Sequence, residues 1–186
     1  MCSYLMWPKR RAMAVFRTIL AVVVSVALLL GVSLTTVFAA EVQVVSDPKS
    51  DCETIMNSVL PFAEKMLTDH GEFIPFGGAM RENGQLVSVA GYDGAGHPMS
   101  NDTIALIKDG FIAAARQGEY KATAIVYDVK VKLPASEEKS DAIAVSLNHR
   151  DNYSIVVFIP YRIDNRRLIL GTAFAQKGEA DIFLPR

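Results

Sequence analysis

Cysteine is scarce in this chain of 186 residues, which has only Cys2 and Cys52. Removal of the N-terminal segment described below would leave Cys52 as the only thiol, so no internal disulfide could form. The domain must then be stable on its apolar core alone. A chain of about 147 residues can bury roughly two-thirds of its surface, which is sufficient without covalent cross-links. Cys52 itself lies on an apolar stripe with helical spacing, which indicates a core residue rather than a reactive thiol.

The sequence also lacks the short motifs that identify common enzymes. It has no Gly-x-Ser-x-Gly turn, no His-Glu-x-x-His, no Cys-x-x-Cys and no Walker lysine. Gly91, Gly94 and Gly96 have a spacing that differs from the dinucleotide fingerprint. The sequence therefore predicts neither a cofactor nor a metal.

Clusters of positive charge are missing as well. Four of the nineteen basic residues precede Ala39 and all twenty acidic residues follow it, so the domain after Ala39 has fifteen basic residues against twenty acidic ones, a net charge of −5. This balance argues against a nucleic-acid partner and against attachment to an anionic membrane. The densest basic site, at Arg162, Arg166 and Arg167, is interrupted by Asp164 and is interpreted as a solvated loop.

Residues 1–39 have the pattern of an export signal. Basic residues precede an apolar run over residues 19–34, and small residues follow it up to Ala39 and Ala40. We expect cleavage after Ala39, with Met13 as an alternative start. The mature chain would then consist of a short polar lead, 40–49, and a single domain, 50–186.

An uncleaved anchor is the alternative interpretation of this segment. The stretch from Thr18 to Ala40 is long enough to span a hydrocarbon core of roughly 30 Å. In both cases the basic flank stays on the cytoplasmic side, so the domain is exported to the periplasm or secreted. Cleavage would leave the domain without a stable membrane contact.

The first predicted helix spans residues 50 to 69. Ser50 followed by Glu53 has the spacing of a capping box, in which each side chain bonds a free backbone N–H. Gly71 supplies the left-handed residue that ends a helix. Pro61 falls inside this helix and predicts a kink in the preceding turn.

A hairpin follows the first helix. Asn83-Gly84 favours a tight turn, so residues 72–81 and 85–92 are predicted to pair as antiparallel strands. Gly77 and Gly78 lie in the first arm, where they predict a bulge or a close approach of another part of the backbone.

A second helix is expected to begin near Ser100 or Asn101 and to end at Gly118. The remainder of the chain is nearly all strand, predicted around residues 123–133, 143–148, 154–161 and 168–175. The order α-ββ-α-ββββ indicates the α+β class. We predict a mainly antiparallel sheet of about five to six strands, with both helices packed on one face.

Seven short segments carry a further signal: Phe73-Ile74-Pro75-Phe76-Gly77, Gly91-Tyr92-Asp93, Tyr127-Asp128-Val129, Asp141-Ala142-Ile143, Asn148-His149-Arg150-Asp151, Pro160-Tyr161-Arg162 and Phe174-Ala175-Gln176. Together they resemble a family of small bacterial proteins of unknown function. The resemblance covers most of residues 52–186 and implies one compact α+β domain. It assigns no catalytic residue, because no activity is established for that family.

The first candidate site is the glycine-rich loop that precedes the second helix. Asp93, His97 and Asp102 lie within ten residues of one another, and carboxylate and imidazole groups are metal ligands. Their spacing matches no known ligand motif. A linker between a hairpin and a helix also attracts Asp, His and Gly for turn formation alone.

The second candidate site is the predicted turn at His149, Arg150 and Asp151. A histidine beside an aspartate can form an acid–base pair. Adjacent strand residues point to opposite faces, however, and the tip of a hairpin is exposed to water. We interpret this turn as a charged surface that could contact a partner protein.

Two functional hypotheses follow from these patterns. The first is a non-catalytic exported domain that binds an envelope or secreted protein or another envelope component. The second is a small hydrolase or metal-dependent enzyme that uses the loop containing Asp93, His97 and Asp102.

Overall fold

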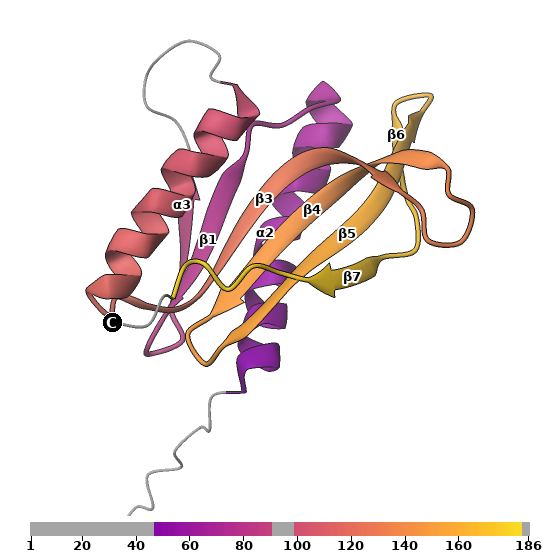
Figure 1. Cartoon of the computed structure of the whole chain (residues 1–186). Helices are drawn as coiled ribbons and strands as arrows, with labels where there is room; N and C mark the ends of the chain where they lie inside the picture. Colours follow the sequence, from indigo (N-terminus) through magenta and orange to yellow (C-terminus); the bar gives the residue numbers. More distant parts are fainter. Residues whose placement is uncertain (1–46, 91–98, 184–186) are drawn as a thin grey trace, which may run out of the picture. The chain divides into compact units, whose positions relative to one another are not determined.

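A computed structural model describes residues 47–90 and 99–183 of the chain (Figure 1). All of them belong to the second of the two units into which the chain divides, Val45–Arg186. The predicted export signal and the loop residues Asp93 and His97 lie outside the described residues. The elements, in chain order, are α2 (Pro48–His70), β1 (Phe76–Arg81), β2 (Leu86–Ala90), α3 (Ser100–Arg116), β3 (Tyr120–Lys132), β4 (Lys139–His149), β5 (Tyr153–Asp164), β6 (Arg167–Leu170) and β7 (Phe174–Lys177).

The strands form one sheet of seven members in which every pair is antiparallel. Their order is β2-β1-β3-β4-β5-β6, and β7 pairs with the other half of the outer edge of β5. The α+β class and the mainly antiparallel sheet are confirmed. The predicted total of about five to six strands was too low, because the last predicted strand is divided into β6 and β7. Between them the N–H of Gly171 donates to the carbonyl of Pro160 at 2.7 Å.

Helix α2 begins two residues earlier than the capping box predicted. Asp47 is the N-cap, and its side chain accepts the N–H of Ser50 at 3.1 Å. Pro48 follows at the first helical position, where its missing N–H has no consequence and its fixed φ suits the helix. Gly71 ends the helix with φ 78°, as predicted.

The predicted hairpin pairing is confirmed, with β1 and β2 joined by residues 82–85, of which 82–84 form the loop closed by a hydrogen bond between residues 81 and 85. The N–H of Arg81 donates to the carbonyl of Gln85 at 2.9 Å, and Gly84 has φ 82°. The connection is therefore a three-residue loop with glycine in the left-handed position.

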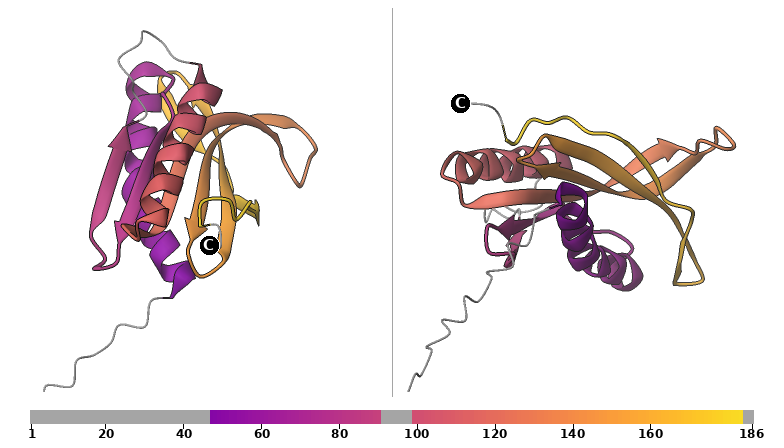
Figure 2. Two further views of the ribbon diagram at one scale, coloured as in Figure 1. Left: turned by 60° about the vertical axis from the view of Figure 1, so that its left-hand side comes forward. Right: turned by 90° about the horizontal axis from the view of Figure 1, so that it is seen from below.

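The two helices lie on opposite faces of the sheet, so the prediction that both pack on one face was wrong. A β-carbon added to Gly78 would lie 2.6 Å from Cγ1 of Val59 on α2. A β-carbon added to the adjacent Gly77 would lie 2.7 Å from Cζ of Phe111 on α3. Since consecutive strand residues face opposite sides, α2 and α3 must be on opposite sides. The right-hand view of Figure 2 shows the strands running between them. The predicted close approach at these two glycines is therefore made by helix side chains and not by another part of the backbone.

Each helix has its own core. The larger core, under α2, includes Cys52, Ile55, Val59, Ala63, Leu67, Ala124, Val126, Ile143, Val145 and Leu147. The smaller core, under α3, consists of Ala79, Ile107, Phe111, Ile125 and Ile182 with partly buried neighbours. Helix α3 packs mainly on β1 and β3. The same face of β4 and β5 therefore continues beyond the helix (Figure 1).

Candidate functional site: a groove beside helix α3

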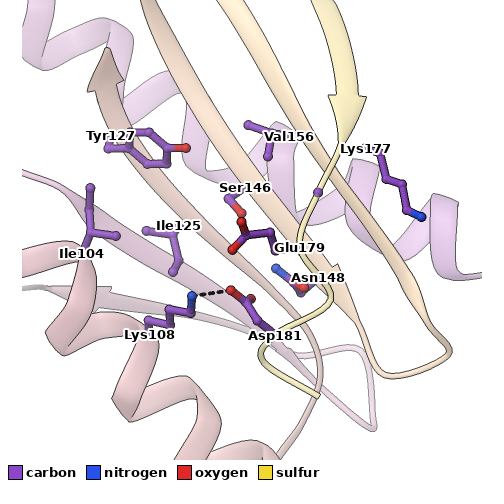
Figure 3. Close-up of a pocket in the computed structure, with 11 residues that line it drawn as sticks. Ile104, Lys108, Ile125, Tyr127, Ser146, Asn148, Val156, Lys177, Glu179 and Asp181 are labelled. Atoms are coloured by element: carbon purple, nitrogen blue, oxygen red, sulfur yellow. Dashed lines mark ion pairs between the residues drawn. The ribbon is translucent and has the colours of Figure 1, made fainter. Parts of the chain in front are cut away.

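A groove with a cavity of about 400 Å³ lies on the α3 face of the sheet. Helix α3 forms one wall, and β3, β4 and β5 form the floor (Figure 3). The other wall is residues 178–183, here called the C-terminal segment, which crosses the sheet from β7 toward α3 (Figure 1). The lining residues are Ile104, Lys108, Ile125, Tyr127, Ser146, Asn148, Val156, Lys177, Gly178, Glu179 and Asp181.

Strand register explains why the floor residues meet. Ile125 of β3 pairs with Ser146 of β4, and Ser146 pairs with Val156 of β5. These three side chains therefore share one face of the sheet. Residues two positions along a strand return to the same face, which adds Tyr127 and Asn148 to the floor.

The start of the C-terminal segment is held against β5. The N–H of Gly178 donates to the carbonyl of Ser154 at 3.1 Å, and the Ser154 hydroxyl donates to the carbonyl of Glu179 at 3.0 Å. A β-carbon at Gly178 would overlap the Ser154 hydroxyl, so only glycine allows this approach. These contacts position Glu179, whose carboxylate points back over the floor of the groove (Figure 3).

The other end of the segment is fixed to α3. Ile182 is 2% exposed and belongs to the core under α3. Lys108 of α3 forms an ion pair with Asp181. The hydrogen bond that Lys108 donates to the Asp181 carboxylate raises the pKa of Lys108, and the nearby charge of Glu179 contributes to the same shift. Lys108 is therefore an ammonium at neutral pH.

Two polar side chains on this face of the sheet lack hydrogen-bond partners among the described residues. Asn148 is 3% exposed, and its amide makes no hydrogen bond to another described group. Its cross-strand neighbour is Thr123, whose buried Oγ1 also has no partner there. Buried polar groups are usually satisfied, so an open Asn148 amide that faces a cavity is a candidate for ligand recognition.

The Tyr127 hydroxyl completes the polar lining. Burial raises the pKa of Tyr127, and the negative charge of Glu179 raises it further. The hydroxyl is therefore protonated at neutral pH and can both donate and accept a hydrogen bond.

A second polar cluster lies on the α2 face and consists of Asp51, Lys121 and His149. Lys121 Nζ is 2.8 Å from Asp51 Oδ2, and His149 Nε2 is 3.3 Å from the same oxygen. The N–H of Asp151 donates to His149 Nδ1 at 3.1 Å, so we assign the neutral ring's proton to Nε2, which donates to Asp51. The cluster joins the first turn of α2 to the start of β3 and the end of β4.

This cluster corrects the prediction for the β4–β5 turn. The side chain of His149 is fully buried rather than exposed to water. Arg150 and Asp151 remain about half exposed, and Arg150 forms an ion pair with Glu82. Arg150 and Asp151 are therefore in contact with water, whereas His149 is not, because its side chain faces α2.

Asp102, the described residue of the first candidate site, lies apart from the second candidate site at His149, Arg150 and Asp151. Asp102 lies exposed in the first turn of α3, as predicted. The other end of α3 adjoins the start of β3, where Ala122 pairs with His149. A helix of 17 residues is about 25 Å long, so Asp102 and His149 lie near opposite ends of α3. Across residues 47–90 and 99–183, no group of three or more His, Cys, Asp or Glu side chains could hold a metal ion.

Sequence reasoning missed every polar residue of the groove. Ser146 and Asn148 occupy alternate positions of a predicted strand, where polar residues are usually exposed, although Asn148 is buried. A polar residue in a strand that is otherwise apolar was the available signal. No signal in the sequence pointed to Glu179, because its position depends on how the C-terminal segment crosses the sheet.

No protein family, curated protein or solved structure matches this chain. In the part of the chain that the structure describes, neither helix is sufficiently long and apolar to cross a membrane.

Proposed function

We propose that this chain is an exported, non-catalytic domain that binds an envelope or secreted partner through the groove beside α3. The observation that carries the proposal is the open amide of Asn148 in a cavity of about 400 Å³. Cavities of roughly 300–1,000 Å³ that combine an apolar floor with a few directed polar groups are typical of ligand sites.

The chemistry of the lining favours binding over catalysis. The lining includes neither histidine nor cysteine, and its hydroxyl groups are those of Ser146 and Tyr127. A serine needs an adjacent base to attack a substrate, and Ser146 has no hydrogen bond to one. The raised pKa of Tyr127 makes it a poor base at neutral pH.

Export rests on the N-terminal pattern, in which basic residues precede an apolar run and small residues. Membership of the small bacterial α+β family that the sequence resembles is part of the same proposal and adds no activity to it. The domain's acidic charge balance supports a protein or other envelope partner over a nucleic acid.

The proposal is tested by blocking the groove. The full-length chain, with an affinity tag, is expressed in its own host beside a Val156→Arg variant, whose long side chain would occupy the floor. Val87→Arg is the matched control, because Val87 is another half-buried strand valine that does not line the groove. Thermal unfolding of each protein establishes that it is folded.

A partner that co-purifies with the wild type and with Val87→Arg but not with Val156→Arg supports the proposal. Equal capture by all three proteins contradicts it, as does the absence of any captured partner or ligand. Turnover of a substrate that disappears in the folded Val156→Arg variant would contradict the non-catalytic assignment.

A further inference from the structure

The lining of the groove holds two carboxylates, Glu179 and Asp181, and two lysines, Lys108 and Lys177, so its formal charge is zero. Lys108 is the ammonium between α3 and the C-terminal segment, and the charges of both Asp181 and Glu179 act on it. Lys177 also lines the groove, but its side chain extends away from Glu179 in Figure 3. Glu179 forms no ion pair with another described residue. Because Lys108 pairs with Asp181, Glu179 is the carboxylate that is left to face the floor of the groove.

The other groups of the groove suit a ligand that combines a hydrogen-bond donor with an apolar chain. Ser146 Oγ, Asn148 Oδ1 and the Glu179 carboxylate are hydrogen-bond acceptors that line one cavity. A primary ammonium offers three donors and no acceptor. Ile125 and Val156 provide an apolar surface along which a methylene chain can lie while its charged end reaches polar groups.

An anionic or purely apolar ligand fits less well. A carboxylate or phosphate on the floor would approach the Glu179 carboxylate, and like charges at short range repel. A purely apolar ligand would leave the Asn148 amide and the Glu179 carboxylate desolvated without a partner, which disfavours binding.

We propose that the groove binds a primary ammonium on a methylene chain, with Glu179 as its counter-charge and Asn148 as a hydrogen-bond acceptor. This inference rests on the proposed function, because it specifies the ligand of the same groove. The ammonium can belong to a free alkyl diamine or to a lysine side chain of a partner protein.

Titrations with defined probes test the inference. The protein purified from its host is ¹⁵N-labelled, and the side-chain amide of Asn148 is followed by NMR. The amine probes are 1,5-diaminopentane and N-acetyl-lysine methylamide, which represent the two sources. Hexanoate and 1-hexanol are the comparison probes, because their alkyl chains are similar in length while hexanoate is negatively charged and hexanol is neutral.

We expect the amines to shift the Asn148 signal and hexanoate to leave it unchanged. Glu179→Gln keeps the side-chain shape and removes the charge, so it should weaken amine binding about tenfold. Glu72→Gln is the control at an exposed position beyond the end of α2, and it should bind the amines as the wild type does. Stronger binding of the diamine indicates a free amine, and stronger binding of the blocked lysine indicates a protein.

The inference is overturned if neither amine binds, if Glu179→Gln binds them as tightly as the wild type, or if hexanoate or hexanol binds equally well. Binding of hexanol alone would still place a ligand in the groove and leave the proposed function standing. The failure of the proposed function is a separate result, namely partner capture that the Val156→Arg variant does not abolish.

Discussion

The buried cluster of Asp51, Lys121 and His149 provides the sharpest test of how the fold is stabilised. The side chains of Asp51 and Lys121 are 15% and 10% exposed, and that of His149 is fully buried. Asp51→Asn preserves the side-chain shape and removes the carboxylate nearest the Lys121 ammonium. The variant can still accept hydrogen bonds, so the change isolates the charge.

The expected loss in the free energy of unfolding is about 2–3 kcal/mol. Removing one partner of a fully buried ion pair costs about 3–5 kcal/mol, because the other charge stays desolvated. We reduce that range because Asp51 and Lys121 keep slight exposure and because the asparagine oxygen still accepts a hydrogen bond. For a domain of this size the loss corresponds to a decrease in Tm of roughly 10 °C.

Urea denaturation at pH 7, followed by far-UV circular dichroism, measures this loss. Asp69→Asn is the matched control, because Asp69 forms an ion pair with Lys65 on the exposed surface of the same helix. Exposed pairs contribute little, so this variant should unfold at the same urea concentration as the wild type. Adding Lys121→Met to Asp51→Asn should restore part of the lost stability, because it removes the desolvated charge. Equal midpoints for Asp51→Asn and the wild type, or no recovery in the double variant, would refute the reasoning.

Three further predictions follow from packing and burial. Gly78→Ala should destabilise the domain by about 1–3 kcal/mol in urea denaturation, because the added methyl group would lie 2.6 Å from Val59. Gly110→Ala is the control, because its methyl group meets open space, and this variant should be as stable as the wild type or more so. A Gly78→Ala variant that is more stable than Gly110→Ala would contradict this packing. Burial raises the pKa of Cys52 to about 12, so a thiol reagent at pH 8 should modify it only after unfolding, and rapid labelling of the native protein would disprove its burial. Burial and the charge of Asp141 raise the pKa of Asp128 in the folded protein above the ordinary value of 3.8. Ionising this carboxyl therefore costs more in the folded state than in the unfolded state, and the free energy of unfolding of the wild type decreases as pH rises above 3.8. Asp128→Asn removes that loss and should gain stability relative to the wild type between pH 4 and pH 7, whereas a constant difference in unfolding free energy would count against it.

Local signals in the sequence were sufficient for both helices, the hairpin and the next three strands, but not for the division of the last predicted strand into β6 and β7. Gly71 and Gly118 adopt the positive φ values that end a helix, and the turn at Asn83-Gly84 joins two paired strands. These signals depend on a few neighbouring residues, because a missing side chain or a short polar one decides the local backbone geometry. The N-cap was misassigned because Asp47 and Ser50 are both good caps, and the chain used the one that precedes Pro48.

The sequence by itself thus determined the α+β class, the order of helices and strands and the apolar faces that form the core. Only the tertiary structure decided which face of the sheet each helix covers. Strand alternation gives β3 two apolar faces, and nothing local assigns α2 to one and α3 to the other. The tertiary structure likewise decided the burial of His149 and the formation of the groove at Asn148 and Glu179. Each requires segments distant in the chain to meet, and that depends on pairing and packing rather than on neighbouring residues.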